Sequence, residues 1–395
     1  MTARYTWQAT KQCSDAGIEF AYASVAGFPA SLRLPGKDRH VCRGLTTFMC
    51  QQVSVIIKAG RKAEATAQTV KLTPEPDGYF SAMVTSAAAG MRYRYRLDDD
   101  PQPYPDPASR FQPYGPHGAS QIIDPQAFHW TDTTWPGVPL EGQVIYELHL
   151  GTFTQEGTWE AASRELPELA EAGMTVIEIM PIAEFAGDYG WGYDGVALFA
   201  PSHLYGTPDD CQRFVDCAHA LGMGVILDVV YNHLGPDGNY LANFSSDYFT
   251  DRYSTDWRPA INFDGEHAGH VRAFFLANAA YWIEEFHFDG LRLDATQEIY
   301  DQSSTYILTA IAQQVRHAAH GRSIILVAEN EPQHTKLVRP PSHGGYGLDA
   351  AWNDDFHHTA MVVLTGHNEA YYSDYQGTPR EFISALKWGY LYQGQ

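Results

Sequence analysis

The chain has 395 residues, of which 44% are hydrophobic and 18% charged, and this ordinary globular composition excludes wholesale disorder. With 26 basic against 47 acidic residues the formal net charge is −21. That balance argues against nucleic acid or an anionic membrane surface as the main partner, because both bind clustered positive charge. The length predicts two or three domains, and aromatic residues, at 13%, are numerous enough to stack on sugar rings.

Cysteine usage and the N-terminal sequence indicate a compartment. The chain begins MTARYTWQATKQC, without the basic and then apolar layout of a signal peptide, and it has no apolar stretch of the length that spans a membrane. Five cysteines without metal-site spacing are predicted to be reduced thiols: Cys13, Cys42, Cys50, Cys211 and Cys217. We therefore expect a cytoplasmic protein without a metal site.

The first 140 residues divide into a β-rich domain and a connection. Short apolar or alternating runs at 53–60, 78–84 and 91–97 are broken by Gly, Pro and Asp, a pattern typical of an all-β sandwich. We predict a sandwich of a carbohydrate-binding type over residues 1–100. Residues 101–140 are rich in proline and turn residues and are predicted to form an ordered connection.

Residues 141–395 are predicted to alternate strands with helices. Buried parallel strands are expected at 144–150, 176–182, 224–230, 290–295 and 325–330, with a sixth near 348–352. Amphipathic helices lie between them. One begins at Pro208 after an N-cap at Thr207, and we expect it to bury Phe214 and Leu221 and to end at Gly222.

Two arrangements fit this repeat, an open doubly wound sheet and a closed eight-stranded barrel. The first strand–helix turn lacks the G-x-G-x-x-G of a dinucleotide site, which weakens the open sheet. Polar and acidic residues follow strand after strand, and this favours the (β/α)8 TIM-type barrel, whose reactive groups gather at the C-terminal rim. Residues 234–289 are predicted to be an excursion from that rim, ending in a helix at about 268–286.

Two carboxylates at strand ends are the candidates for chemistry. Asp294 and Glu329 each end an apolar strand, where a carboxylate is costly unless it has partners. Arg292 lies two residues before Asp294 and so on the same face of the strand. An adjacent arginine favours the ionised form, which suits a nucleophile, whereas the apolar run before Glu329 suits a proton donor. A structural ion pair is the alternative for each carboxylate taken alone.

Three motifs carry a resemblance to a known family. DVVYNH (228–233), GLRLDA (290–295) and VAEN (327–330) resemble signature regions of the α-amylase superfamily of glycoside hydrolases, in the right order and each at a strand end. The resemblance implies a (β/α)8 barrel preceded by a β-sandwich. It also implies that Asp294 is the nucleophile, Glu329 the general acid/base, Arg292 the partner of the nucleophile, and His233 a contact to the sugar.

Further segments narrow the resemblance. YGWGYDGVALFAPSHLYGTPDD (189–210), NHLGPDGNYL (232–241) and WNDDFHH (352–358) are similar to the maltooligosyltrehalose trehalohydrolase family. The resemblance implies further substrate contacts at Trp191, Tyr193, Thr296, Gln297, Asp354, Asp355, Phe356, His357 and His358. From the residues alone, aromatic packing, a solvated acidic pair and a loop remain alternatives for these positions.

The implied reaction is hydrolysis of the α-1,4 bond beside the terminal trehalose unit of maltooligosyltrehalose, with retention and without a cofactor or metal. Retention would place the two carboxyl groups about 5–5.5 Å apart. Two other functions stay open. A glucan branching enzyme would use the same carboxylates on another acceptor, and a glucan-binding fragment would lack catalysis. Oligomeric state is not indicated.

The sequence departs from the family at both ends. The Asn-His-Asp motif of the third carboxylate is absent, and His367-Asn368-Glu369 is only a reversed near-match. We therefore expect an incomplete barrel, whose last two strands would lie beyond Gln395, and an open strand edge that promotes aggregation. Residues 10–50 lack the opening strand expected of such a sandwich, and a disturbed reading frame is one hypothesis for them.

Overall fold

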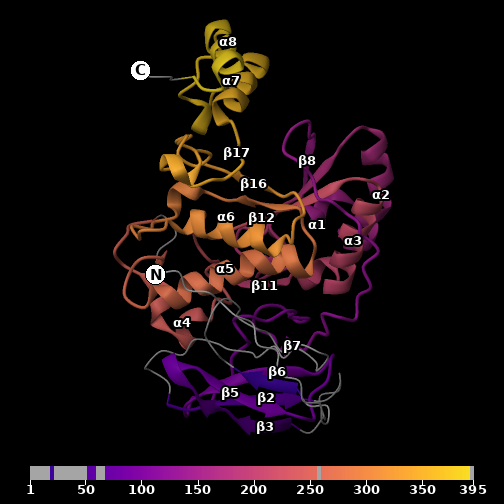
Figure 1. Cartoon of the computed structure of the whole chain (residues 1–395), viewed down its shortest axis with the longest axis vertical. Helices are drawn as coiled ribbons and strands as arrows, with labels where there is room; N and C mark the ends of the chain where they lie inside the picture. The colour runs from indigo at the N-terminus through magenta and orange to yellow at the C-terminus, as the bar shows by residue number, and fades with distance from the viewer. Residues whose placement is uncertain (1–17, 22–50, 59–66, 256–258, 392–395) are drawn as a thin grey trace.

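The fold is taken from a computed structural model that describes residues 18–21, 51–58, 67–255 and 259–391. Apart from the short strand β1 (Ile18–Ala21), the atypical stretch 10–50 lies outside these residues. Among the described residues, no helix is long and apolar enough to cross a membrane. Figure 1 places the N-terminal sheets at one end of the long axis and the last two helices at the other.

Two antiparallel sheets form the N-terminal part. One has the order β3-β2-β6-β7 and the other β1-β5-β4. Their remaining strands are β2 (Val53–Lys58), β3 (Ala67–Lys71), β4 (Thr73–Pro74), β5 (Phe80–Val84), β6 (Arg92–Leu97) and β7 (Ser120–Gln121). In β6, Tyr93, Tyr95 and Leu97 are buried, and the arginines between them are only half-buried. Because strand side chains alternate between faces, this pattern puts one apolar face of the sheet against the core.

A six-stranded parallel sheet forms the centre of the molecule. Its order is β17-β16-β15-β12-β9-β8. Each strand therefore pairs with the strand of this sheet that precedes it in the sequence. The strands are β8 (Ile145–Leu148), β9 (Val176–Ile179), β12 (Gly224–Val229), β15 (Gly290–Leu293), β16 (Ile325–Ala328) and β17 (Ala350–Ala351). This is the strand order of a barrel wall, and it confirms the predicted parallel strands and the sixth strand.

Helices connect the parallel strands. The longer ones are α2 (Trp159–Glu171), α3 (Pro208–Ala220), α5 (Ala268–Glu285) and α6 (Ile307–Ala318), and α2 packs on α3 as α5 packs on α6. The short elements are α1 (Leu150–Phe153), β10 (Ala183–Glu184), β11 (Ala197–Pro201), α4 (Leu241–Phe244), β13 (Phe249–Thr250) and β14 (Ala260–Ile261). Helix α3 has the predicted N-cap at Thr207. The expectation for Leu221 was wrong, because this C-cap residue is 42% exposed where the chain turns at Gly222.

The inner face of the parallel sheet has an apolar layer and a charged layer. Val176, Ile226, Ile325 and Val327 form one small cluster with Val138 of the connection. Two residues further along the strands, the same face carries charged side chains: Glu178, Asp228, Arg292 and then Asp294. The strand period of two therefore places several charged side chains at the carboxyl ends of the strands, where the candidate site lies.

Helices α7 (Asp354–Thr365) and α8 (Pro379–Trp388) form a hairpin after β17. Asn353 caps α7 through its side chain, which also donates to the carbonyl oxygen of Gly389. A separate small core of Val362, Tyr375 and Leu391 stabilises the hairpin.

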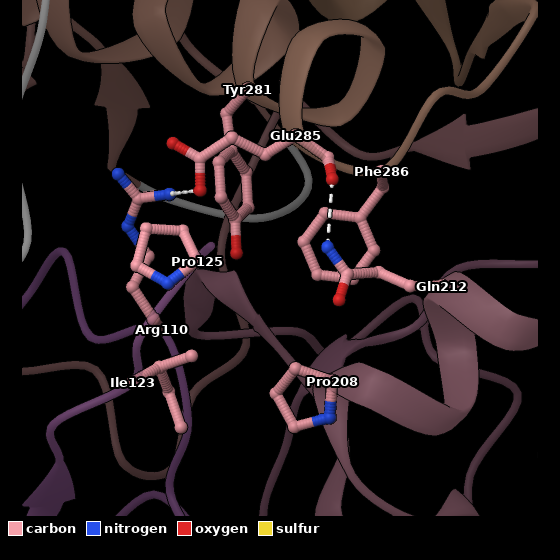
Figure 2. A pocket seen from close by; sticks show the side chains of 8 residues that line it. All are labelled: Arg110, Ile123, Pro125, Pro208, Gln212, Tyr281, Glu285 and Phe286. Carbon is pink, nitrogen blue, oxygen red and sulfur yellow. Dashed lines mark hydrogen bonds and ion pairs between the residues drawn. The ribbon is translucent and has the colours of Figure 1, made fainter. Parts of the chain in front are cut away.

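The Pro-rich connection contacts the barrel at two places, the end of helix α5 and the segment before β16. Arg110 forms an ion pair of 2.7 Å with Glu285 and lies over the ring of Tyr281. Figure 2 shows this pair among the residues that line a small open recess. Further along, Gly137 bridges to Ser323 at the start of the β16 segment. A Cβ at Gly137 would lie 1.9 Å from the Ser323 carbonyl oxygen, and φ is +78°, so only glycine fits there.

Candidate active site

The end of β15 carries the central charged group of the site. Nη1 of Arg292 lies 2.9 and 3.0 Å from the two carboxylate oxygens of Asp228 on β12, and 2.5 Å from Oδ1 of Asp294. Arg292 and Asp228 are buried, with 8% and 1% exposure. Burial raises the pKa of Asp228 to about 7, although Arg292 opposes the shift. One guanidinium thus orients two carboxylates from neighbouring strands.

The segment after β12 positions the other side of Asp294. The side-chain nitrogen Nδ2 of Asn232 donates to both the carbonyl oxygen and Oδ2 of Asp294, each at 2.9 Å. The Oδ1 of Asn232 contacts Nδ1 of the buried His233. Burial lowers the pKa of His233, which favours the neutral imidazole. Asp294 is therefore held by Arg292 on one oxygen and by Asn232 on the other.

Glu329 follows β16 directly and faces the residues after Asp294. Its Oε2 accepts a hydrogen bond of 2.7 Å from the backbone amide of Ala295. Ala295 has a φ of +39°, in the left-handed region that residues other than glycine seldom adopt. Burial raises the pKa of Glu329, although Arg292 and this amide oppose the shift. A raised pKa favours the protonated form of the carboxyl group, which is the form that a general acid uses.

Thr296 and Gln297 connect the same two strand ends. The amide and hydroxyl of Thr296 donate to the carbonyl oxygen of Glu329 at 2.9 and 2.8 Å. The Thr296 hydroxyl also accepts from Asn330, and Gln297 accepts from the amide of Glu331 at 3.4 Å. These contacts fix the backbone around Glu329. The predicted contacts of Thr296 and Gln297 with substrate stay predictions.

Two aromatic residues of the loop after β10 have different surroundings. The hydroxyl of Tyr193 donates to Oδ2 of Asp228 at 3.0 Å, so this ring belongs to the buried charged group. The side chain of Trp191 is 72% exposed and is available to solvent. Gly192 between them passes so close to Pro181 that a Cβ would lie 1.9 Å from its carbonyl oxygen. The loop is thereby held against the segment that follows β9.

The predicted residues of the WNDDFHH segment divide between the site and the hairpin. Asp354 is an electrostatic neighbour of Glu329, and burial raises its pKa against the influence of His358 and His357. Asp355 is 9% exposed, and its oxygens accept from the Tyr375 hydroxyl and the Leu391 amide at 3.0 and 2.7 Å.

The aromatic residues of that segment pack within the hairpin. Phe356 stacks on Phe382 of α8, and His358 packs against Tyr371 and Tyr372. Of this set, Asp354 has an electrostatic influence on Glu329. A substrate contact of the others stays a prediction.

Sequence reasoning missed one buried group of this site. Glu178 of β9 is 1% exposed, and neither of its carboxylate oxygens has a hydrogen-bond partner among the described residues. The available signal was a single acidic residue inside the apolar run VIEIMPI (176–182). Within the described ranges, no cluster of three or more His, Cys, Asp or Glu side chains is arranged to hold a metal ion.

Comparisons with known proteins identify the domain. A family profile of the α-amylase catalytic domain matches residues 122–260. The malto-oligosyltrehalose trehalohydrolase of Saccharolobus solfataricus is 46% identical over 80% of this chain and 55% of its own length. That of Deinococcus radiodurans is also 46% identical, over 78% of this chain and 49% of its own length. A branching enzyme of Pseudoalteromonas atlantica is 31% identical over 73% of this chain and 45% of its own.

A solved structure supports the same assignment. The putative α-amylase of Salmonella typhimurium is 37% identical and superposes with a TM-score of 0.81 over 95% of this chain and 61% of that one. The chain spans about half the length of the curated relatives it matches. The predicted resemblance and fold class are confirmed. The described residues include six parallel strands of an α-amylase-type barrel, and the chain is similar to malto-oligosyltrehalose trehalohydrolases over about half of their length.

Proposed function

We propose that this homologue of the malto-oligosyltrehalose trehalohydrolases is a retaining glycoside hydrolase that releases trehalose from maltooligosyltrehalose. The identity of 42–46% to several enzymes of that name, against 31% to a branching enzyme, supports this choice. The observation that carries the proposal is the pair of differently held carboxyl groups on neighbouring strands. Asp294 is bound to Arg292, and Glu329 has a raised pKa.

The proposed reaction has two balanced steps. In the first, an oxygen of Asp294 attacks the anomeric carbon, the α-1,4 bond breaks, and Glu329 gives its proton to the leaving glycosidic oxygen. In the second, Glu329 takes a proton from water, whose oxygen displaces Asp294 from the sugar. Trehalose leaves with the first step if it occupies the aglycone side, and a shortened maltooligosaccharide leaves after the second.

The remaining site residues would hold the sugars. We assign a contact at the cleaved unit to His233 and Tyr193, and stacking on a glucose ring to Trp191. Asp354 lies near enough to Glu329 to influence it, and a sugar hydroxyl group between them would suit both. The same proposal keeps substrate contacts for Thr296, Gln297, Asp355, Phe356, His357 and His358, and a carbohydrate-binding sandwich over residues 1–100.

The test compares Asp294→Asn and Glu329→Gln with the unmodified chain. Each substitution keeps the shape of the side chain and removes the charge or the transferable proton. We expect Glu329→Gln to lower kcat by about 10²- to 10⁴-fold, and Asp294→Asn to lower it at least as much. Trehalose released from maltooligosyltrehalose is measured, with Glu331→Gln as the matched control. Parental activity in both variants would refute the assignment.

A branching enzyme is the second candidate because one relative with that name shares the domain. It predicts new α-1,6 branches in amylose and no free trehalose. A glucan-binding protein without catalysis is the third, and it predicts binding of maltooligosaccharides without turnover. Product analysis and calorimetric binding to the same preparation separate the three.

The cytoplasmic location is also a proposal. It rests on cysteine usage, and Cys211 and Cys217 are free thiols in the described part of the chain. Fractionation of cells that express the chain, with detection by antibody, tests it.

A further inference from the structure

Glu178 lies near two other acidic side chains and one basic side chain. Its charged neighbours are Asp228 on β12, Glu147 on β8 and Arg292 on β15. The ion pairs of Arg292 go to Asp228 and Asp294, and its Nε has no partner among the described residues. The single positive charge of Arg292 therefore already forms ion pairs with two carboxylates. A third buried negative charge beside it would have nothing to pair with.

The hydrogen bonds decide which buried carboxyl group is left out. Asp228 receives contacts from Arg292 on both oxygens and a further one from the Tyr193 hydroxyl. Both oxygens of Glu178 are buried without such a contact in the described part of the chain. Burial raises the pKa of Glu178 to about 8, with the charges of Asp228 and Glu147 adding to the shift and Arg292 opposing it.

We propose that Glu178 is a positioning residue that stays protonated beside Arg292 and thereby leaves the guanidinium to Asp228 and Asp294. A neutral Glu178 does not form an ion pair with Arg292, so the contact of 2.5 Å between Arg292 and Asp294 is kept. When Glu178 ionises, it competes for the same guanidinium and draws it away from Asp294. The effect on catalysis rests on the proposed function, whereas the proton on Glu178 does not.

The direct test is infrared spectroscopy of the chain at pH 7. A protonated carboxyl group gives a carbonyl stretching band that a carboxylate lacks. Glu329 and Asp228, whose pKa values are also raised, can contribute to the same band, so the Glu178 component is read from difference spectra. We expect a carbonyl band in the difference between the unmodified chain and Glu178→Gln, and none in the difference between the unmodified chain and Glu147→Gln, which removes the exposed glutamate paired with Glu178 in register. An identical band in the unmodified chain and in Glu178→Gln overturns the proposal.

The catalytic consequence is read with a substrate that needs no proton donor. Fluoride release from α-maltosyl fluoride depends on the nucleophile and not on protonated Glu329. Above the pKa of Glu178, about 8, we expect the kcat of the unmodified chain to fall by up to about tenfold per pH unit and that of Glu178→Gln to stay level. KM is expected to change little in either chain. Parallel pH profiles for the two chains overturn the positioning role.

Failure of this inference and failure of the proposed function give different results. If the unmodified chain releases no fluoride and no trehalose, the glycosidase proposal is wrong, and the infrared band still decides whether Glu178 holds a proton. If the chain is active and the band is unchanged in Glu178→Gln, the activity stands and the inference is wrong.

Discussion

Trp191 and Tyr193 show how one loop can supply two kinds of aromatic group. The hydroxyl of Tyr193 is bound to Asp228, so its ring is fixed with the buried charges. Trp191, two residues earlier, has a 72% exposed side chain on a loop held by close backbone contact at Gly192. A rigid loop with an exposed indole offers a flat surface at little entropic cost to binding. We therefore expect Trp191 to act on affinity and Tyr193 on the chemistry.

Trp191→Ala should raise KM and leave kcat nearly unchanged. Loss of one stacking contact of about 0.5–1.5 kcal/mol corresponds to about a 2- to 12-fold weaker interaction. Steady-state kinetics of trehalose release measure the effect. Trp388→Ala is the control, because Trp388 is also well exposed, at 60%, but lies on α8. A fall in kcat with KM unchanged would contradict this role for Trp191.

The residues that sequence reasoning could place are those at strand ends. Asp294 and Glu329 follow apolar strands, and the period of two puts Arg292 on the same face as Asp294. Glu178 was beyond reach for a physical reason. Its place in an apolar strand is visible in the sequence, but its neighbours Asp228 and Arg292 come from strands 50 and 114 residues away, and only the folded sheet shows that their hydrogen bonds go elsewhere.

At the scale of elements, a buried cluster joins the connection to helix α3. Nδ1 of His219 lies 2.8 Å from Oδ2 of Asp132, and its Nε2 lies 2.8 Å from Oδ2 of Asp289. Asp289 also accepts from the indole of Trp135 at 2.7 Å and from the backbone amide of Val225 at 2.9 Å. Burial acts to lower the pKa of His219, but the hydrogen bonds with the two aspartates outweigh it and raise the pKa.

His219→Gln should therefore destabilise the chain more at pH 6 than at pH 9. A raised pKa in the folded state means that the contribution of His219 is full below the ordinary value of 6.5 and is lost as pH rises through the raised value. Breaking a buried ion pair costs about 3 kcal/mol, which we expect at the lower pH. Urea unfolding at both pH values measures the difference.

Helix α6 supplies the control for that experiment. His317→Gln removes an exposed histidine near the end of the helix, and its effect should be small at either pH. An equal loss of stability in His219→Gln at pH 6 and pH 9 would mean that the charge of His219 contributes nothing to the cluster.

Elements were predictable where local signals are strong. The N-cap, proline and acidic first turn of α3 fixed its start, and the capping box of Thr207 and Asp210 confirms that reasoning. The hairpin of α7 and α8 was not anticipated, because its core depends on Asp355 binding Tyr375 and Leu391, 20 and 36 residues later. Contacts over such separations leave no periodic pattern in the sequence.

At the scale of the whole molecule, Arg110 attaches the connection to the barrel wall. Its side chain is 8% exposed, pairs with Glu285 at the end of α5, and lies 4.1 Å from the ring centroid of Tyr281. Figure 2 shows the ion pair with Tyr281 beside it. Both the charge and the flat face of the guanidinium are used, which a lysine could not reproduce. We infer that this contact holds the connection against the wall.

Arg110→Ala should cost about 3 kcal/mol of the free energy of unfolding, because it breaks a largely buried ion pair with Glu285. Arg164→Ala, which removes an exposed pair with Glu156 and Glu160, should change it by less than about 1 kcal/mol. Urea unfolding gives both values, and limited proteolysis should cut residues 101–140 faster in the first variant only. Equal stability of the two variants would show that the buried pair does not anchor the connection.

The strand order of the central sheet also bears on how the molecule is made. From β8 to β17, every strand pairs with the one made just before it in that sheet. During synthesis each new strand can therefore add to an edge that already exists, and no strand has to be inserted between two others. Because partners follow one another in the sequence, the sheet can grow strand by strand as the chain leaves the ribosome. Among the described residues, β8 stays at one end of the sheet throughout that growth, and each later strand is added at the opposite end.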